Sequence, residues 1–528
     1  MRFLIRNLCR LLFVAAAGAL LPSALSAQTH VAKRVPSQPQ ALNVRVALAK
    51  NLPSAVSGRL LIFLTSKKVE DEEIAPDFRD PHAVWIEAQE VHNAGAGQTI
   101  NIGPQAAAYP DNFSKLPRGD YSAMAVLDVN HDYAYAGLSG GDLRGPIQHL
   151  GPLLDAHARN VSLMLNAIVP EPVVKARDSV EVVQFPSPSL SAFWGRAIRM
   201  NAAVVLPPSY KSNSDKHYPT MYWTHGFGAT FPIIVNRSTQ TFVDGMASGK
   251  LPEMIYVLLD EHCPGGTHEF ADSVNNGPWG KALTEELIPY LEQKYRMDAA
   301  PSGRLLNGHS SGGWAVLWLQ VAYPEFFGGT WPTSPDPSDF HSFTGPNLLA
   351  SPSQNLYRKP DGSPWMLVRL EGKDRIALEE FARQEAVEGN YGGQMASFEW
   401  VFSPRGQDGT PQQLFDRDTG EINADVARAW EKYDIATIIS NDADRLRPLL
   451  RDKIHLTVGT IDTFHLDEPA RLLQKTLQDA GIRAEFTYLD GRDHFNLYQD
   501  GLMEKITQQM MRVARPQAPK ATLAISSH

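Results

Sequence analysis

From about residue 190 the chain alternates apolar runs of strand length with segments of helical periodicity, and no other feature limits its fold as strongly. The stretch "MIYVLLDE" (254–261) is a continuous apolar run, as expected for a strand covered on both faces. The stretch "KALTEELIPYLEQKY" (281–295) instead places its leucines at helical spacing. The same alternation predicts strands at 198–208, 218–226, 303–308, 454–459 and 483–489, and helices at 313–325, 468–481 and 495–514. Such a chain folds as a mostly parallel sheet with helices on both faces.

The first third of the chain has a different pattern. Short, partly alternating runs between turn residues predict strands at 42–48, 58–65, 83–91, 98–103, 121–129 and 160–166. This spacing is typical of an antiparallel all-β sandwich, which we assign to residues 28–165. A proline-rich linker, 166–189, leads into the α/β domain, 190–515, and a tail at 516–528 is expected to be disordered.

A long segment, residues 336–453, interrupts the alternation between two predicted strands. It contains helical pieces at 375–387 and 424–433 and several turn-rich stretches. An insertion of this size between core strands predicts a cap over a functional site. Decoration away from the site is the alternative.

The first 27 residues have the features of a signal peptide. Arg2, Arg6 and Arg10 precede an apolar stretch that is too short to span a bilayer, and small residues follow it. We therefore expect cleavage after residues 1–27 and export to the periplasm or beyond, without membrane insertion of the mature protein. An uncleaved membrane anchor is the alternative.

The charge balance limits the partners. The formal net charge is −9, and it becomes −12 when the three arginines of residues 1–27 are removed. Because an acidic protein repels phosphates, we expect no nucleic acid partner.

Two pentapeptides, 308–312 (GHSSG) and 137–141 (GLSGG), match the pattern G-x-S-x-G. Only the first follows an apolar strand and precedes a long helix, which is the context of a nucleophile elbow. The glycines relieve the crowding of the tight turn, and the helix N-terminus favours developing negative charge. The context predicts that Ser310 is a nucleophile; a plain strand–helix turn is the alternative.

A serine hydroxyl needs a base that removes its proton. Asp462 follows the predicted strand 454–459, and His494 follows the predicted strand 483–489. Both residues fall at the carboxyl end of a strand, where α/β sheets place their chemistry. The chain order of serine, acid and histidine predicts Ser310, Asp462 and His494 as the catalytic residues.

Acyl transfer also requires donors for the oxyanion of the tetrahedral intermediate. The stretch "WTHGFGAT" (223–230) follows a predicted strand, and its His-Gly pair lets backbone N–H groups turn into a pocket. The expected donors are the amides of Phe227 and Ser311. A simple glycine loop is the alternative.

Neighbouring side chains are assigned to substrate binding or to structure. His309 is next to the nucleophile and cannot reach its hydroxyl as a base, so we expect it to line the pocket together with Trp223 and Trp314. Aromatic residues near a core are also often packing residues. Asp467 is a rival for the acid, but its position favours a cap on the following helix.

A weaker signal resembles the start of a calcium loop. Asp128, Asn130 and Asp132 have its spacing, but Tyr133 and Ser139 stand where an EF-hand has glycine and glutamate. A turn between strands is the favoured interpretation. The predicted chemistry requires neither a metal nor a cofactor.

Several stretches together resemble one family: "YWTHGFG", "NNGPWGKALTEELIPYLEQKYR", "GRLLNGHSSGGWAVLWLQVAYPEFFGG", "GTIDTF" and "DGRDHF". They are similar to the putative-esterase (esterase D-like) family, which includes enterochelin esterases, feruloyl and acetylxylan esterases and S-formylglutathione hydrolases. The resemblance covers roughly 190–335 and 454–505. It implies an α/β-hydrolase fold after the β-sandwich, and a carboxylic-ester hydrolase that acts on a small-molecule or saccharide ester. An acyltransferase with the same triad and a catalytically inactive binding protein are the alternatives.

Overall fold

The computed structural model describes residues 42–53, 55–69, 73–153, 160–175, 177–389 and 393–516. The predicted signal peptide, residues 1–27, lies outside this part of the chain, and so does all but the first residue of the predicted tail. Within the described ranges, no helix is both long enough and apolar enough to cross a bilayer.

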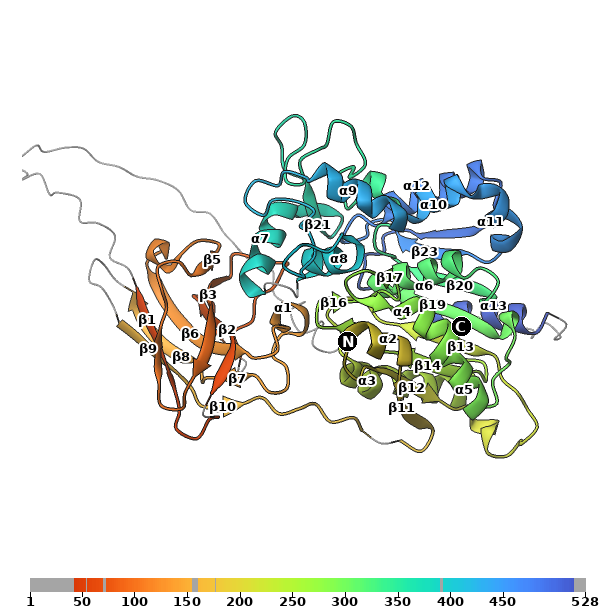
Figure 1. Cartoon of the computed structure of the whole chain (residues 1–528), viewed down its shortest axis with the longest axis horizontal. Coiled ribbons are helices and arrows are strands. Elements are labelled where there is room, and N and C mark those ends of the chain that lie inside the picture. The colour runs from red at the N-terminus through yellow and green to blue at the C-terminus, as the bar shows by residue number, and fades with distance from the viewer. Residues whose placement is uncertain are drawn as a thin grey trace, which may run out of the picture.

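The N-terminal strands form two sheets, which lie at one side of the molecule (Figure 1). A three-stranded sheet has the order β4-β1-β9, and a larger sheet has the order β10-β7-β6-β2-β3-β5 with β8 paired to β6. The elements are β1 (Asn43–Leu48), β2 (Val56–Thr65), β3 (Val84–Ala94), β4 (Thr99–Asn101), β5 (Ala107–Tyr109), β6 (Gly119–Asp128), α1 (Tyr133–Ala136), β7 (Leu143–Arg144), β8 (Gln148–Leu153), β9 (Asn160–Leu165) and β10 (Ala167–Ile168).

An apolar core fills the space between these two sheets. Alternate residues of β1 and β9, among them Val46 and Leu163, pack against Ile62 of β2 and Ala125 of β6. The prediction of a purely antiparallel sandwich is wrong at one pair, because β1 and β9 run parallel. The two strands are far apart in the sequence, so no tight hairpin forces them to be antiparallel.

The outer face of the larger sheet is buried as well. Leu61 and Phe63 of β2 pack there with Tyr133 of α1 and with Val387, which belongs to the 336–453 segment. Arg59 also donates from its Nε to the Val387 carbonyl at 2.9 Å. The N-terminal sheets therefore contact the segment that the sequence predicts as a cap.

The rest of the chain is built on one eight-stranded sheet in the order β11-β12-β14-β13-β19-β20-β23-β24. The β11–β12 and β12–β14 pairs are antiparallel, and the other pairs are parallel, which confirms the predicted mostly parallel sheet. Its strands are β11 (Val180–Pro186), β12 (Arg199–Val205), β13 (Thr220–Thr224), β14 (Ile255–Leu259), β19 (Arg304–His309), β20 (Gly329–Thr333), β23 (His455–Gly459) and β24 (Glu485–Leu489).

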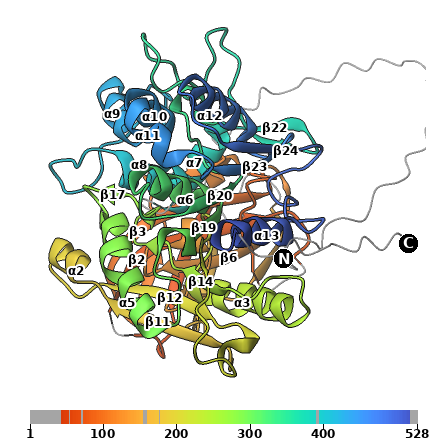
Figure 2. The same cartoon turned by 90° about the vertical axis from the view of Figure 1, so that its right-hand side faces the viewer.

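Helices cover both faces of this sheet, as predicted (Figure 2). Helices α3 and α13 pack on one face, and α5, α6 and α12 pack on the other. Helix α13 begins later than predicted because the side chains of Asp493 and Asn496 accept hydrogen bonds from backbone amides of the turn that precedes it. The helices are α2 (Pro188–Trp194), α3 (Phe231–Ala247), α4 (Trp279–Ala282), α5 (Ile288–Lys294), α6 (Ser311–Ala322), α12 (Asp467–Asp479) and α13 (Leu502–Ala514).

The 336–453 segment divides into two parts. Helix α8 packs against a loop after β14, where the Thr267 amide donates to Ser397 Oγ at 2.9 Å. Helices α10 and α11 instead pack against α6 or α12 and belong to the helical layer of the sheet. The elements are β15 (His262–Cys263), β16 (Gly266–Thr267), β17 (Asp272–Ser273) and β18 (Gly277–Pro278) in the loop, and β21 (Met366–Leu370), β22 (Lys373–Ala377), α7 (Leu378–Glu388), α8 (Gln394–Phe402), α9 (Ala424–Trp430), α10 (Ile435–Asn441) and α11 (Ala443–Leu450) in the segment.

Candidate active site

Ser310 stands alone between β19 and α6, in a strained conformation. Its φ of 60° and ψ of −126° place a non-glycine residue in a region that such residues rarely adopt. Backbone hydrogen bonds hold it there: its amide donates to Thr333 O at 3.1 Å, and its carbonyl accepts from the Asp336 amide at 3.2 Å. Strain that the surroundings maintain is typical of functional residues.

Glycines on both sides of Ser310 are required by close approach. A Cβ at Gly308 would meet Gly312 O at 2.1 Å, and a Cβ at Gly312 would meet His225 O at 2.4 Å. Since both obstacles are backbone atoms, only glycine fits either position without moving the turn or the loop after β13. The glycines that the motif requires therefore bring the strand, the helix and that loop together.

Asp462 and His494 form a buried pair. The Asp462 Oδ2 and His494 Nδ1 atoms are 3.0 Å apart, and the side chains are 0% and 4% exposed. The other carboxylate oxygen, Oδ1, accepts from the Phe464 amide at 2.9 Å. Burial alone would raise the pKa of Asp462, but the neighbouring His494 and the hydrogen bonds outweigh it and lower that pKa.

The three predicted catalytic residues follow β19, β23 and β24 at the same edge of the sheet. The ring of His309, which precedes Ser310, lies 4.5 Å from the His494 ring between centroids. Among the described residues the Ser310 hydroxyl forms no hydrogen bond, so the expected bond to His494 is not made in this structure. Catalytic hydrogen bonds in unliganded enzymes are often long and shorten when substrate binds.

The loop after β13 lies directly against the nucleophile. A Cβ at Gly226 would come within 2.9 Å of Ser310 Cβ. Within the described part of the chain, the amides of Phe227 and Ser311 donate to no other group. Two unpaired amides beside a serine can hold an oxyanion, as the sequence predicts.

Asp336, the first residue of the 336–453 segment, lies beside Ser310 and Ser311 although no sequence motif singles it out. Its Oδ2 accepts from Ser311 Oγ at 2.7 Å, and its amide donates to Ser310 O. Burial raises the pKa of Asp336 to about 6. Its position just after β20, at the same sheet edge as Asp462, was the available signal.

The predicted substrate residues have different surroundings. His309 is half-buried between His494 and Tyr498, its Nδ1 lies 3.2 Å from Thr333 Oγ1, and burial lowers its pKa to about 3. The ring is therefore neutral over the usual pH range. Its contact with substrate stays a prediction.

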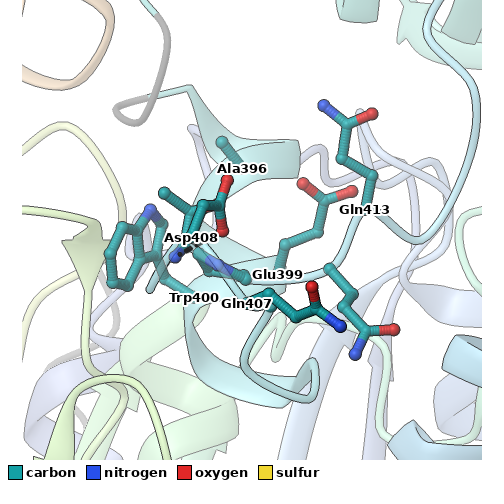
Figure 3. Close-up of a pocket in the computed structure, with 10 residues that line it drawn as sticks. Ala396, Glu399, Trp400, Gln407, Asp408 and Gln413 are labelled. Carbon is teal, nitrogen blue, oxygen red and sulfur yellow. Dashed lines mark hydrogen bonds between the residues drawn. The ribbon is translucent and has the colours of Figure 1, made fainter.

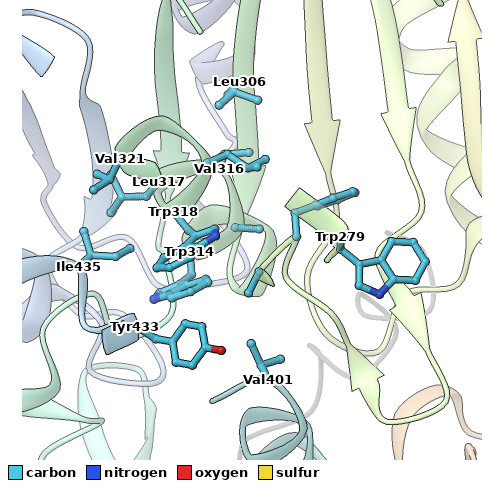
Figure 4. Packing of buried hydrophobic residues seen from close by; sticks show 14 of the residues in the cluster. Trp279, Leu306, Trp314, Val316, Leu317, Trp318, Val321, Val401, Tyr433 and Ile435 are labelled. Carbon is cyan, nitrogen blue, oxygen red and sulfur yellow. The ribbon is translucent and has the colours of Figure 1, made fainter. Parts of the chain in front are cut away.

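Trp314 requires a correction. Its side chain is 1% exposed and stacks on Trp318 at 5.4 Å between ring centroids, inside the largest apolar cluster (Figure 4). The prediction that it lines a substrate pocket is wrong, because α6 is buried along almost its whole length. Trp223 is half-buried and packs with the cluster under α3 and α13.

Tyr135, in α1, reaches the loop after β13 from the N-terminal sheets. Its ring meets the Phe227 ring edge-on at 4.7 Å and stacks on His262 at 4.6 Å. Its hydroxyl donates to Ala229 O at 2.8 Å. The sequence offered no signal for this contact, which joins segments that are distant in the chain.

Two groups of side chains in the described residues could hold a metal: Asp128, Asp132 and Asp142, and Asp339, His341 and Asp434. In the first group the buried carboxylates already accept from backbone amides, for instance from Tyr133 and Val129. This arrangement agrees with the predicted turn between strands.

A separate pocket of about 440 Å³ lies within the 336–453 segment (Figure 3). Helix α8 and the loop 406–413 form its walls. Two acidic residues, Glu399 and Asp408, line it, and Glu399 pairs with Arg417 at 2.8 Å. No residue of the predicted triad lines it, so its position does not connect it with ester cleavage.

Comparison with known proteins gives one family. A family model described as "Putative esterase" matches residues 197–503, which is more than half of the chain. Among curated proteins, the uncharacterized protein YbbA of Bacillus subtilis (strain 168) is 25% identical over 134 residues, 23% of this chain and 51% of YbbA. The matched region thus spans about half the length of that relative.

Solved structures similar to this chain include esterases. A ferulic acid esterase is 17% identical, with 63% of this chain and 98% of that chain covered and a TM-score of 0.40. An S-formylglutathione hydrolase from Agrobacterium tumefaciens is 15% identical, with 64% and 98% covered and a TM-score of 0.40. FphF, a fluorophosphonate-binding serine hydrolase from Staphylococcus aureus, is 13% identical, with 63% and 97% covered and a TM-score of 0.38. The family assignment follows from the family model and not from these distant likenesses.

Proposed function

We propose, from the premise that the chain belongs to the putative esterase family and is a carboxylic-ester hydrolase, that Ser310, His494 and Asp462 cleave the ester through an acyl-enzyme. The observation that carries this proposal is the buried Asp462–His494 pair at the sheet edge where strained Ser310 stands. On this basis the eight-stranded sheet with its helices is an α/β-hydrolase domain.

Acylation begins with attack of Ser310 Oγ on the ester carbonyl carbon while His494 Nε2 takes the hydroxyl proton. Asp462 holds Nδ1 of the ring and stabilises the imidazolium that forms. The amides of Phe227 and Ser311 donate to the carbonyl oxygen as it becomes negative. When the C–O bond to the alcohol breaks, His494 gives its proton to the leaving oxygen.

Deacylation repeats these steps with water. His494 removes a proton from the water while the water oxygen attacks the carbonyl carbon of the acyl-enzyme. The bond from that carbon to Ser310 Oγ then breaks as His494 returns the proton to the serine. Charge at the oxyanion is favoured further because Ser310 precedes α6, a helix of 12 residues whose N-terminus carries partial positive charge.

The substrate in this proposal is a small-molecule or saccharide ester, in line with the ferulic acid esterase and S-formylglutathione hydrolase among the similar structures. The mature chain acts after export, on the basis of the signal-peptide features of residues 1–27. Residues 28–165 are proposed as an all-β domain that precedes the catalytic one.

The proposal is tested by trapping the acyl-enzyme. Mature protein is mixed with a slowly deacylating aryl ester, digested, and mapped by mass spectrometry. We expect the acyl group on Ser310, and none on the peptide in a Ser310→Ala variant. Acylation at another residue, or full turnover by the variant, would overturn the proposal. A second arm adds a small alcohol in excess: a transferred acyl product in place of free acid identifies an acyltransferase.

A further inference from the structure

An exposed aromatic ring stands next to the proposed general base. Phe495 is 46% exposed, and its ring centroid lies 5.3 Å from that of His494 with the planes nearly perpendicular. A single exposed apolar side chain is common on a protein surface, whereas a contiguous apolar patch often marks a binding site. The rings around Phe495 therefore decide whether it belongs to such a site.

Phe495 is part of a group of three rings that we call the aromatic wall: Phe78, Phe464 and Phe495. Phe464 meets the His494 ring edge-on at 4.9 Å. Phe78 lies 5.7 Å from Phe464 and 6.2 Å from Phe495. Phe464 and Phe495 come from the loops that carry the acid and the base, whereas Phe78 comes from the loop between β2 and β3 of the N-terminal sheets.

Arg79 holds two of these rings in place. Its guanidinium carbon lies 5.3 Å from the centroid of Phe78 and 5.6 Å from that of Phe495. Its Nε lies 3.5 Å from Asp77 Oδ1, so its charge is balanced locally. The wall consequently presents apolar ring faces with little net charge.

We propose that the aromatic wall is the subsite of the leaving alcohol, and that it takes an alcohol that carries a flat apolar ring. The inference rests on the proposed function, because His494 must protonate the leaving oxygen and the alcohol therefore lies against the His494 ring. The acyl part lies on the other side of the scissile bond, toward the Phe227 and Ser311 amides. Ring faces stack favourably on aromatic walls, whereas a flexible chain gains less from them. Phe78 then makes the N-terminal sheets part of the active site.

The test compares esters that share one acyl group. Benzyl butyrate and hexyl butyrate form the same butyryl-enzyme, so any difference in kcat/KM arises in acylation, and their alcohols are similar in acidity. We expect the benzyl ester to be preferred, and the benzyl-to-hexyl ratio to fall about tenfold in Phe78→Ala, which is the scale of one aromatic contact. Phe78→Leu keeps an apolar side chain without a flat ring and should lower the ratio as well.

Two further variants guard against misfolding as the cause. Phe495→Ala changes an exposed ring and should reproduce the fall in the ratio. Phe193→Ala is the matched control, since Phe193 is 39% exposed and also has a guanidinium, that of Arg405, 5.6 Å from its ring. It should leave the ratio unchanged. Labelling of Ser310 by a fluorophosphonate confirms in each variant that the triad is assembled.

The outcomes separate this inference from the proposed function. An unchanged ratio in Phe78→Ala and Phe495→Ala, with Ser310 still labelled, overturns the subsite and leaves the triad standing. The subsite is also overturned if Phe78→Ala and Phe495→Ala lower the kcat/KM ratio between phenylacetyl and hexanoyl esters of one alcohol, because those two esters differ only in the acyl group. A higher kcat/KM for 6-O-butyryl glucose than for benzyl butyrate contradicts the proposal that the leaving alcohol carries a flat apolar ring. Absence of all ester hydrolysis overturns the proposed function itself.

Discussion

The chain contains the same pentapeptide pattern twice, and the two copies lie in opposite surroundings. At 308–312 the serine joins a strand to a helix and has a φ of 60°. At 137–141 the serine lies in a turn between the short helix α1 and strand β7. The pattern alone therefore does not determine the surroundings of its serine.

The difference is in the charges and hydrogen bonds around each hydroxyl. Ser139 Oγ donates to Asp132 at 2.7 Å and lies 3.3 Å from an oxygen of Asp142. Those carboxylates oppose any negative charge that forms on a bound carbonyl oxygen. Ser310 instead adjoins two unpaired amides and a helix N-terminus, which favour such charge. Electrostatics, and not the motif, separates the two serines.

Replacement of each serine gives the largest expected difference. Ser310→Ala should lower kcat by about 10⁶-fold, the scale seen when a triad nucleophile is removed. Ser139→Ala should leave kcat within about twofold, because its hydroxyl serves only the turn. Steady-state hydrolysis of a butyrate ester measures both. The comparison breaks if the Ser139 variant loses activity while its thermal unfolding is unchanged.

The carboxylates beside the two serines differ in the same way. Asp462→Asn should lower kcat by about 10³- to 10⁴-fold, because an amide favours the wrong tautomer of His494. Asp132→Asn is the matched change at the other motif and should keep kcat near that of the parent. Equal activity in Asp462→Asn and the parent would show that another acid holds the imidazole.

Local patterns predicted what is local in the structure. The position of Ser310, Asp462 and His494 at one sheet edge could be predicted because each follows an apolar strand, and parallel strands end at one edge. Trp314 could not be placed correctly, because a helix that is apolar on all sides does not reveal which face meets a pocket.

Contacts between distant segments had no local signal. The parallel β1–β9 pair joins the first and last long strands of the N-terminal sheets. From those sheets, Tyr135 reaches Phe227 in the loop after β13, and Phe78 reaches Phe464 in the loop after β23. The aromatic residues themselves are visible in the sequence, but their partners depend on how the sheets pack against the catalytic part.

Glycines in the two motifs respond to different constraints. Gly312→Ala puts a Cβ 2.4 Å from His225 O and must displace the loop that carries Phe227, so we expect kcat to fall about 100-fold. In Gly141→Ala the new Cβ would lie 3.9 Å from Asn130 Nδ2, so the substitution is strained only by a φ of 94°. It should cost about 1–2 kcal/mol of stability without loss of kcat. Kinetics together with thermal unfolding distinguish the two results.

The smallest expected effect concerns the pH dependence of stability at the Ser139 turn. Burial raises the pKa of Asp142 to about 7, so the folded state holds its proton more tightly than the unfolded state, where the value is about 4. The unfolded state therefore binds fewer protons between these values, and the contribution of Asp142 to stability falls as pH rises from about 4 through 7. The contribution of Asp462 to stability changes in the opposite direction. Its pKa is lower in the folded state, so this contribution is fully present at a pH above the unfolded pKa and is lost as the pH falls.

Asp142→Asn removes the titration, although it also loses one acceptor at every pH. The loss of Tm relative to the parent should hence be larger at pH 5 than at pH 8, where the parent must bury a charged carboxylate. Asp418→Asn, which changes an exposed aspartate, should show no such difference between the two pH values. If the loss of Tm in Asp142→Asn is larger at pH 8 than at pH 5, the folded state favours the charged form of the Asp142 carboxylate. The turn around Ser139 then disfavours negative charge less than its three acidic residues indicate.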